Sequence, residues 1–242
     1  MTAVLSAGLR TPQKDVVMSE PSLDGVRSAA VSAERIGAEA ALSSVWQDLI
    51  DGRLRVSDAF FTRDRCFLVL VVPRGAVCTL SGRRRLVLEK LLSGQNGKEL
   101  SFELGVALST ISQDAKLALS QLGFDRTAGR VHPLLAMSAR ASMSGSLSHG
   151  RAGWFGHANE TYRVVGALRP DQQLGPVLPP AELAVVRGLV EGRNYKEIAE
   201  SRGTSTRTVA NQLAAAFRRL GVSGRCRLLD LLTRSHDTAR VA

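Results

Sequence analysis

Four residues in the C-terminal third of the chain have types and a spacing that suit contact with nucleic-acid bases. Arg207, Asn211, Ala214 and Arg218 recur at i, i+4, i+7 and i+11, which places them on one face of a helix. Asn can bond adenine through two hydrogen bonds, Arg reaches guanine or phosphate, and Ala can touch the thymine methyl group. Because a helix fits the DNA major groove, this face predicts DNA binding, with RNA or an anionic membrane surface as the alternatives.

The charge around this face supports a polyanion partner. Residues 201–227 hold six arginines and no acid, a net of +6, whereas an ordinary solvated helix face mixes its signs. These arginines are Arg202, Arg207, Arg218, Arg219, Arg225 and Arg227.

The charge of the whole chain is uneven in the same direction. The 242 residues carry 32 Lys+Arg and 22 Asp+Glu, a net of +10. Residues 1–125 hold 15 and 14 of these, a net of +1, and residues 126–242 hold 17 and 8, a net of +9. A uniformly basic composition would spread the excess evenly, so one part of the molecule is expected to bind the polyanion.

The elements needed to position the polar face can be predicted from the same segment. Val209, Leu213, Ala216, Phe217 and Leu220 form a buried face opposite it, and Gly203 permits a tight turn before a cap at Thr204 or Ser205. Two shorter helices are expected upstream, from Pro179 to Gly192 and from Tyr195 to about Ser201. The pattern therefore predicts a small helical module that presents one polar helix face.

This segment resembles the LuxR/GerE-type helix-turn-helix, a four-helix DNA-binding domain of bacterial transcription regulators. The residues that carry the resemblance lie in LPPAELAVVRGLVEGRNYKEIAESRGTSTRTVANQLAAAFRRLGVSGRCRLLDLL. The match rests on Glu182, Val185, Glu191-Gly192, Lys196 to Ala199, Ser205, Arg207 to Val209, Asn211, Leu213 and Arg218 to Val222. In such domains the helix from 204 to 220 is the recognition helix, and Lys196 and Thr208 lie near phosphates. Pro179 and Ala210 depart from the family pattern, so no operator preference is transferred.

The resemblance and the stripe together define the candidate DNA-binding residues on and before the helix around 205–220. They are Lys196, Ser205, Thr206, Arg207, Thr208, Asn211, Gln212, Arg218 and Arg219. The resemblance also implies a dimerisation helix near 223–233. There Leu228, Leu229, Leu231 and Leu232 are more apolar surface than one short helix face needs, so a homodimer is expected.

An internal repeat organises the rest of the chain. Residues 178–222 align with residues 80–124 at an offset of 98 without a gap and with 12 identities in 45 positions, including Asn96/Asn194, Lys98/Lys196 and Gly105/Gly203. Each copy follows a strand candidate that ends in proline. A repeat of this size indicates duplication of a structural unit, so the first copy is interpreted as a degenerate LuxR-like helix-turn-helix.

The role of the first copy stays open between three hypotheses. Its window 103–129 has a net charge of −1, which predicts weak DNA binding because affinity scales with the phosphates neutralised. It can serve packing or dimerisation, act as a second DNA reader together with Arg83-Arg84-Arg85, or dock another protein. The second candidate DNA site consists of Lys98, Ser109, Thr110, Gln113 and Lys116.

The predicted fold is mainly α with a small antiparallel β component and two tandem strand-plus-helix-turn-helix units. The segment 33–50 reads as a helix anchored by Trp46, and 54–61 with 66–72 reads as a β-hairpin. Trp46 and the Phe60/Phe61 pair are favoured as core residues over a base-stacking platform. The predicted organisation is a disordered tail (1–30), a first unit (33–124), a linker or long loop (125–160), a second unit beginning with a strand at 161–168 (161–234) and a tail (235–242).

Other classes of function find little support in the residues. The four histidines are scattered, no catalytic or nucleotide-binding motif is present, and the three cysteines form no CxxC pair, so no enzyme, cofactor or metal site is expected. No apolar run reaches the roughly 18 residues of a membrane helix and no signal peptide is recognised, so a cytoplasmic, nucleoid-associated protein is expected. Met1 and Met18 are alternative starts.

These observations predict a sequence-specific transcription regulator that binds double-stranded DNA. The alternative is an adaptor that docks on RNA polymerase or another regulator through the degenerate helix-turn-helix. The operator, the target genes, the input signal and the sign of regulation do not follow from the sequence.

Overall fold

A computed structural model describes residues 23–75, 79–80, 82–124, 131–146 and 148–238, with side chains to Arg234. The helices are α1 (Leu23–Ile36), α2 (Leu42–Ile50), α3 (Gly82–Leu92), α4 (Gly97–Leu104), α5 (Leu108–Gln121), α6 (Pro133–Ser144), α7 (Pro180–Val190), α8 (Tyr195–Arg202), α9 (Thr206–Leu220) and α10 (Arg225–Thr238), with a 3-10 helix η2 (Pro170–Leu174) before α7. The strands are β1 (Ala38–Ala41), β2 (Arg55–Phe61), β3 (Arg65–Val71), β4 (His149–His157) and β5 (Glu160–Leu168).

All five strands belong to one antiparallel sheet with the order β1-β4-β5-β3-β2. The expected hairpin is present as β2 and β3, and the expected strand at 161–168 is β5. β3 pairs directly with β5, with Leu68 opposite Val165, so strands from both halves of the sequence share the centre of the sheet. The division of the chain into two units separated by a linker is therefore wrong for the sheet, which both halves build.

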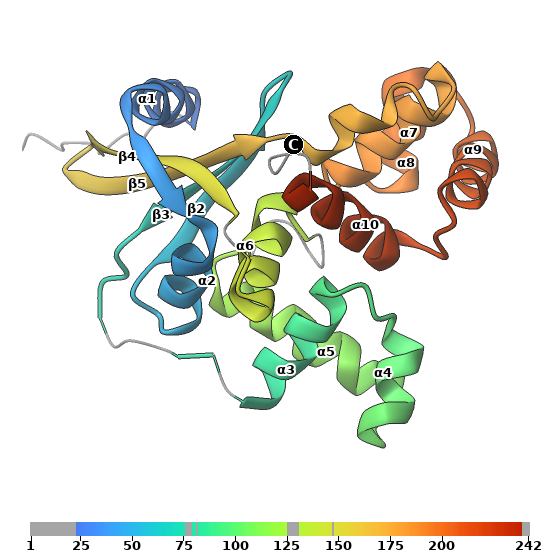
Figure 1. Cartoon of the computed structure of the whole chain (residues 1–242), viewed down its shortest axis with the longest axis horizontal. Helices are drawn as coiled ribbons and strands as arrows, with labels where there is room; N and C mark the ends of the chain where they lie inside the picture. Colours follow the sequence, from blue (N-terminus) through green and yellow to red (C-terminus); the bar gives the residue numbers. More distant parts are fainter. Residues whose placement is uncertain (1–22, 76–78, 81, 125–130, 147, 239–242) are drawn as a thin grey trace, which may run out of the picture.

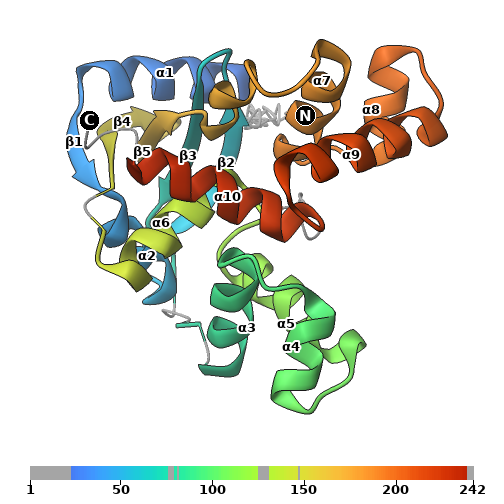
Figure 2. The same cartoon turned by 45° about the vertical axis from the view of Figure 1, so that its right-hand side comes forward.

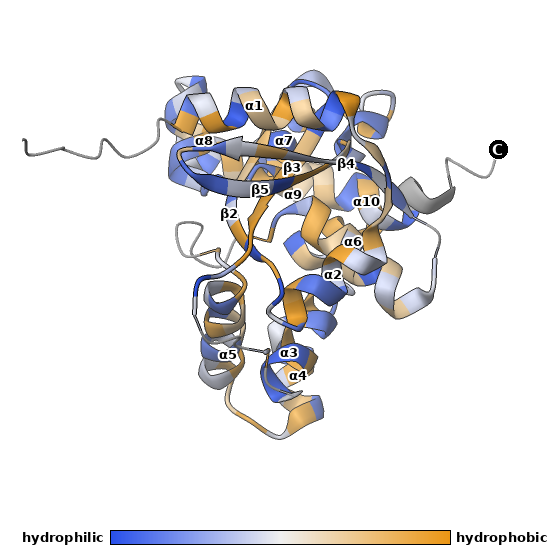
Figure 3. Cartoon of the chain, turned by 90° about the vertical axis from the view of Figure 1, so that its left-hand side faces the viewer, coloured by the Kyte–Doolittle hydropathy of each residue, from blue (hydrophilic) through white to orange (hydrophobic). Residues whose placement is uncertain are grey.

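Alternating side chains of the sheet are buried in two hydrophobic cores, one on each face of the sheet. Phe67 and Val69 face α1, whose Val26, Ala30 and Ala33 are buried against them. Cys66, Leu68 and Leu70 face the opposite side, where α2 and α6 pack (Figure 3). Strand periodicity produces this two-sided burial because successive side chains point to opposite faces.

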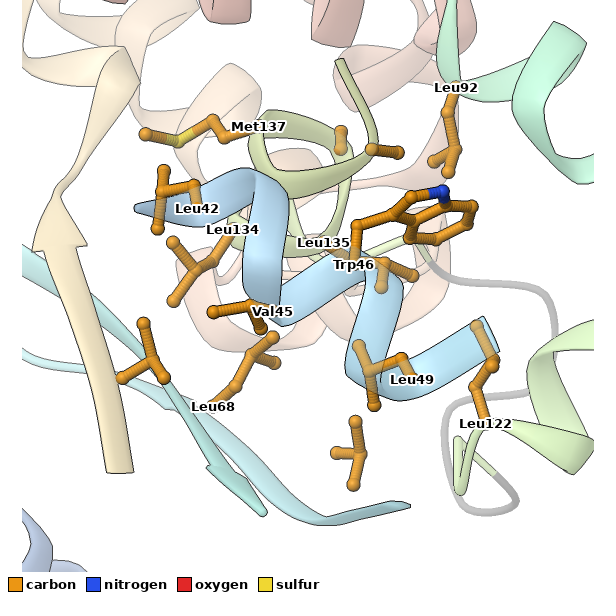
Figure 4. Close-up of a cluster of buried hydrophobic side chains, with 14 of the residues drawn as sticks. Leu42, Val45, Trp46, Leu49, Leu68, Leu92, Leu122, Leu134, Leu135 and Met137 are labelled. Carbon is orange, nitrogen blue, oxygen red and sulfur yellow. The ribbon is translucent and has the colours of Figure 1, made fainter. Parts of the chain in front are cut away.

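Trp46 and Phe60 are core residues, as the sequence favoured, and Phe61 is half-buried against the core. Trp46 of α2 is fully buried with Leu42, Val45 and Leu49, between the sheet and α6 (Figure 4). Phe60 is buried, and its ring stacks on Phe67 with centroids 4.8 Å apart. Neither ring is available for base stacking.

The predicted linker at 125–160 contains a helix and a strand, α6 and β4, in its described part. α6 lacks a helical hydrophobic period because nearly every side is buried, from Pro133 through Ala139. The glycines of β4 permit close packing: a Cβ on Gly153 would lie 2.1 Å from the carbonyl oxygen of Ala33 in α1. Small residues that resemble a flexible linker are thus required here by burial.

Three further boundaries differ from the sequence expectation. The helix expected at 33–50 is divided into α1, β1 and α2. The division falls at Gly37, where a Cβ would lie 2.1 Å from the carbonyl oxygen of Ala152 in β4. α1 begins at Leu23, inside the predicted tail 1–30, because its apolar face covers the sheet. α10 continues to Thr238, inside the predicted tail 235–242, while residues 1–22 and 239–242, with Met1 and Met18, lie outside the described residues.

Two sets of helices lie beyond the sheet (Figure 1). The first contains α3, α4 and α5, and the second contains α7, α8 and α9. α10 runs between them in both Figure 1 and Figure 2, and it contacts α6 and α3 as well as η2. The last helix of the chain therefore joins the second set to the first.

Candidate nucleic-acid interface

The C-terminal set is built around one continuous apolar cluster. Val209, Leu213 and Ala216 of α9 are at most 1% exposed and pack with Val185 of α7 and Ile198 of α8. The cluster also contains residues of α10 and η2, which close the remaining sides. The inward face of α9 is thus fixed over its length, which determines what its other face presents.

The turn between α8 and α9 is defined by caps. Asn194 and Glu197 form a reciprocal capping box at the start of α8, and Gly203 ends that helix in the left-handed conformation at φ 60°. Ser205 then caps α9, its hydroxyl accepting from the Thr208 backbone N–H at 3.1 Å. Only three residues separate the two helices, so the second emerges at a fixed angle to the first.

The polar stripe of α9 is exposed as predicted. Arg207, Asn211, Ala214 and Arg218 all face solvent, opposite the buried cluster. Within the described residues, neither Arg207 nor Arg218 forms an ion pair or a side-chain hydrogen bond. Two uncompensated cations therefore flank an amide and a methyl group on one face, the combination that base and phosphate contacts require.

The remaining predicted residues have different environments. Lys196 is exposed and 3.8 Å from Glu200, while Thr206 is exposed at the first turn of α9. The Ser205 and Thr208 hydroxyls lie 2.9 Å apart, so both are engaged in the cap. Gln212 is half-buried, and its Oε1 is enclosed without a hydrogen-bond partner among the described residues. Gln212 thus lies at the margin of the stripe.

Four of the six arginines in this region contact the protein itself. Arg219 pairs with Glu182 at 3.1 Å, and Arg227 lies 3.5 Å from Glu99. Arg202 and Arg225 donate to the carbonyl oxygens of Ala181 and Leu189 at 2.8 and 2.6 Å, respectively. The net charge of +6 therefore overstates the number of cations that are free to meet a phosphate.

A buried ion pair that the sequence analysis missed attaches this module to the sheet. Arg169, directly after β5, is 7% exposed and bonds both carboxylate oxygens of the fully buried Asp171, at 3.1 and 3.0 Å. It also reaches Glu191 at the end of α7, at 2.8 Å. The only sign of this ion pair in the sequence is Arg169-Pro170-Asp171 between β5 and α7. Which residues Arg169 and Asp171 contact depends on the tertiary fold.

The leucines of α10 are covered inside the chain. Leu228 and Leu232 are fully buried in the C-terminal cluster, Leu229 is 3% exposed, and Leu231 is half-buried. Leu229 faces the first helical set, beside Leu88 and Leu91 of α3. The leucine surface from which the homodimer was predicted is therefore largely covered within the chain, and the homodimer itself stays a prediction.

The two helical sets correspond element by element. α3 and α7 start at 82 and 180, and α4 and α8 at 97 and 195, the same offset of 98 residues as in the sequence repeat. Asn96 forms a capping box like that of Asn194, and Gly105 ends α4 at φ 63° where Gly203 has φ 60°. Equivalent residues thus have equivalent local conformations.

The surface of the first set differs from that of the second. Four residues of the second candidate DNA site are exposed and one is half-buried: Lys98, Ser109, Gln113 and Lys116 are exposed, and Thr110 is half-buried. Arg83 donates two hydrogen bonds to the carboxylate of Asp114, at 2.8 and 3.2 Å. Arg85 pairs with Glu89 at 2.9 Å. On either side of the α4–α5 turn, Phe102 of α4 is 89% exposed and Leu108 of α5 is 43% exposed, where the second set has Glu200 and Thr206. This surface is apolar where the other is polar.

The described histidine and cysteine side chains lie in separate parts of the fold. His149 and His157 lie in β4, and His132 is a buried cap of α6. Burial raises the pKa of the Cys66 thiol to about 12, and Cys78 lies outside the described residues. In the described part of the chain, no three His, Cys, Asp or Glu side chains are grouped to hold a metal ion, and no helix is long and apolar enough to span a membrane.

Comparison with protein families identifies one segment. Residues 176–232 match the model for bacterial regulatory proteins of the luxR family, known as GerE. Comparisons with curated proteins and with solved structures give no match. The match confirms the resemblance for residues 176–232, which begin just after η2 and end within α10. It identifies this segment as a LuxR-family helix-turn-helix domain. Domains of this family bind DNA in transcription regulators, and the family is not a family of enzymes.

Proposed function

We propose that the protein is a sequence-specific transcription regulator that reads the major groove of double-stranded DNA with α9. The observation that carries this proposal is the exposed stripe of Arg207, Asn211, Ala214 and Arg218 on a helix whose opposite face is buried at Val209, Leu213 and Ala216. Asn211 is assigned to a base edge, and Arg207 and Arg218 to a base edge or phosphate. Lys196, Ser205, Thr206 and Thr208, at the helix N-terminus and the preceding turn, are assigned to the phosphate backbone.

The test compares the affinity of the protein for a selected DNA site with its affinity for a scrambled site. Full-length protein is used to select duplexes from a random pool, and the preferred site is then titrated against a scrambled site. We expect Asn211→Ala to reduce the ratio of the two affinities by about tenfold, or about 1.4 kcal/mol, within the roughly 1–3 kcal/mol expected for one lost base contact. Glu39→Ala, which alters an exposed residue of β1 outside the C-terminal module, is the control. An unchanged ratio for Asn211→Ala would exclude the assigned reading face.

We further propose that α3 to α5 are a degenerate second copy of the helix-turn-helix. The shared offset of 98 and the matching caps support this assignment. The sheet supports this assignment too, because β3 and β5 pair antiparallel with Leu68 opposite Val165. The offset of 98 residues would relate Leu68 to residue 166, so the paired residues are equivalent in the repeat to within one position. Antiparallel pairing of equivalent strands relates the two hairpins by a local two-fold rotation, as in a symmetric dimer.

In place of a homodimer, we propose that the two units pair within one chain. Contacts of α10 with α6 and α3 support this arrangement, since Leu229, one of the leucines expected at a dimer interface, is buried beside α3. Light scattering at micromolar concentration is expected to give the mass of one chain, 25.9 kDa. A stable dimer mass would refute the intramolecular pairing.

A second function of the degenerate unit is favoured by its apolar turn. Phe102 and Leu108 are exposed where the C-terminal unit carries polar residues, so this turn suits a protein surface better than phosphates. We propose docking on RNA polymerase or another regulator there, in preference to a second DNA site at Lys98, Ser109, Thr110, Gln113 and Lys116. Phe102→Ser is expected to weaken the effect of the protein on transcription in vitro, whether activation or repression, while leaving DNA affinity unchanged. An equal effect of the variant on transcription would exclude docking, and lost DNA affinity would favour the second site.

A further inference from the structure

A cavity lies where the first helical set meets the last helix of the chain. Its volume is about 260 Å³, and its walls are formed by α3, α5 and the first two turns of α10. Its lining includes Leu88, Ile111, Ala115, Lys116 and Leu119 of the first unit and Arg225 and Cys226 of α10. The site therefore takes residues from both units.

The repeat explains why a cavity exists at this place. Ala115 stands where the C-terminal unit has Leu213, and Leu119 stands where it has Phe217. In the C-terminal unit the larger side chains join one continuous cluster through α7 to α10. In the first unit the apolar residues are divided between two clusters, with Leu88 and Leu119 in one and Ile111 in the other. Smaller side chains have left the space between them unfilled.

The charges on the wall define the kind of molecule that fits. Lys116 and Arg225 contribute two cations, and none of the lining residues is an acid. Cys226 remains a neutral thiol at physiological pH, because burial raises its pKa. Among the described residues Lys116 has no ion-pair partner, whereas Arg225 donates to the Leu189 carbonyl oxygen and keeps its charge. An apolar cavity with an uncompensated cation at its margin favours an amphipathic anion.

We propose that this cavity binds a small apolar monocarboxylate, with its hydrocarbon part among Leu88, Ile111 and Leu119 and its carboxylate at Lys116. The ligand bridges α5 and α10, so it contacts both units at once. This assignment does not depend on DNA reading, because none of the lining residues belongs to the stripe of α9.

The experiment uses octanoate as the probe and 1-octanol as its neutral counterpart, titrated calorimetrically into the full-length protein. We expect one octanoate per chain, with 1-octanol at least about fivefold weaker because it lacks the charge-assisted bond to Lys116. Lys116→Gln should remove that preference. No octanoate binding at millimolar concentration, or equal binding of the two probes, would overturn the proposal.

A filling variant tests the location. Ala115→Leu introduces the side chain found at the equivalent position 213, and it should abolish octanoate binding while raising the melting temperature of the free protein. Ala107→Leu adds the same side chain at an exposed position outside the cavity and should leave binding unchanged. If Ala115→Leu does not fold, Leu119→Phe fills the same space with the residue type found at 217. Undiminished octanoate binding to a folded filling variant would overturn the site.

Discussion

Arg140 of α6 donates to the carboxylate of Asp230 in α10 at 2.8 Å, although the two residues are 90 positions apart in the sequence. Asp230 is 5% exposed, and it also accepts from Arg234 at 3.0 Å on its own helix. Its side chain packs directly on the backbone at Gly94, in the turn after α3. One buried carboxylate thus connects the last helix to both α6 and the first helical set.

The Asp230 contact is expected to contribute strongly to stability. Asp230→Ala removes the buried carboxylate together with the hydrogen bonds that it accepts from Arg140 and Arg234, so the free energy of unfolding should fall by about 3 kcal/mol. Urea titration followed by far-UV circular dichroism measures it. Arg234→Ala removes an exposed partner of the same carboxylate and should cost at most about 1 kcal/mol. Equal losses would mean that the contact between helices contributes nothing beyond the local pair.

The turn at Gly94 is predicted to tolerate no side chain. Its φ is 90°, and a Cβ there would lie 2.7 Å from Cβ of Asp230. Gly105 has φ 63° but open space around it, so Gly105→Ala isolates the backbone strain, about 1–2 kcal/mol. We expect Gly94→Ala to lower the melting temperature further than Gly105→Ala. The same decrease in both variants would argue against close packing of α10 on this turn.

Adjacent arginines of α9 should differ in DNA binding. Arg218 has no ion-pair partner among the described residues, whereas Arg219 is 3.1 Å from Glu182. Arg218→Ala should reduce the slope of log affinity against log salt by about 0.9, the release expected for one phosphate contact. Arg219→Ala should change it less, because that charge is already compensated. Fluorescence anisotropy at several salt concentrations measures both slopes, and a larger effect of Arg219→Ala would reverse the assignment.

His132 should make the protein less stable as the pH falls. Its burial lowers the pKa to about 3, and its Nδ1 accepts from the Leu134 backbone N–H at 3.3 Å. Between about pH 6.5 and pH 3 the unfolded chain therefore binds a proton at His132 that the folded chain excludes. The free energy of unfolding should fall by up to about 1.4 kcal/mol for each pH unit of acidification in this range.

The matched variant His132→Asn keeps a capping acceptor without a titrating ring. Its stability should decline less steeply than that of the parent protein in denaturant titrations between pH 6.5 and pH 4. Parallel declines would show that His132 does not contribute to the acid sensitivity.

The C-terminal module could be predicted from the sequence because its determinants are local. The buried face of α9, the cap at Ser205 and the left-handed turn at Gly203 involve residues a few positions apart. Helical periodicity records which side of α9 is buried, so the exposed side follows by exclusion. The hairpin of β2 and β3 was predictable for the same reason.

Tertiary structure alone decided the features that depend on distant partners. α6 and β4 were read as a linker, because their small residues suit both flexible segments and closely packed backbone, and only contact with α1 and the sheet distinguishes the two. Net charge likewise could not separate Arg218 from Arg219, since Glu182 reaches only the latter. The sequence indicated that α10 carries an apolar surface, but it did not show what covers it. Leu228 and Leu232 are buried in the C-terminal cluster and Leu229 lies beside α3, through contacts that no local period encodes.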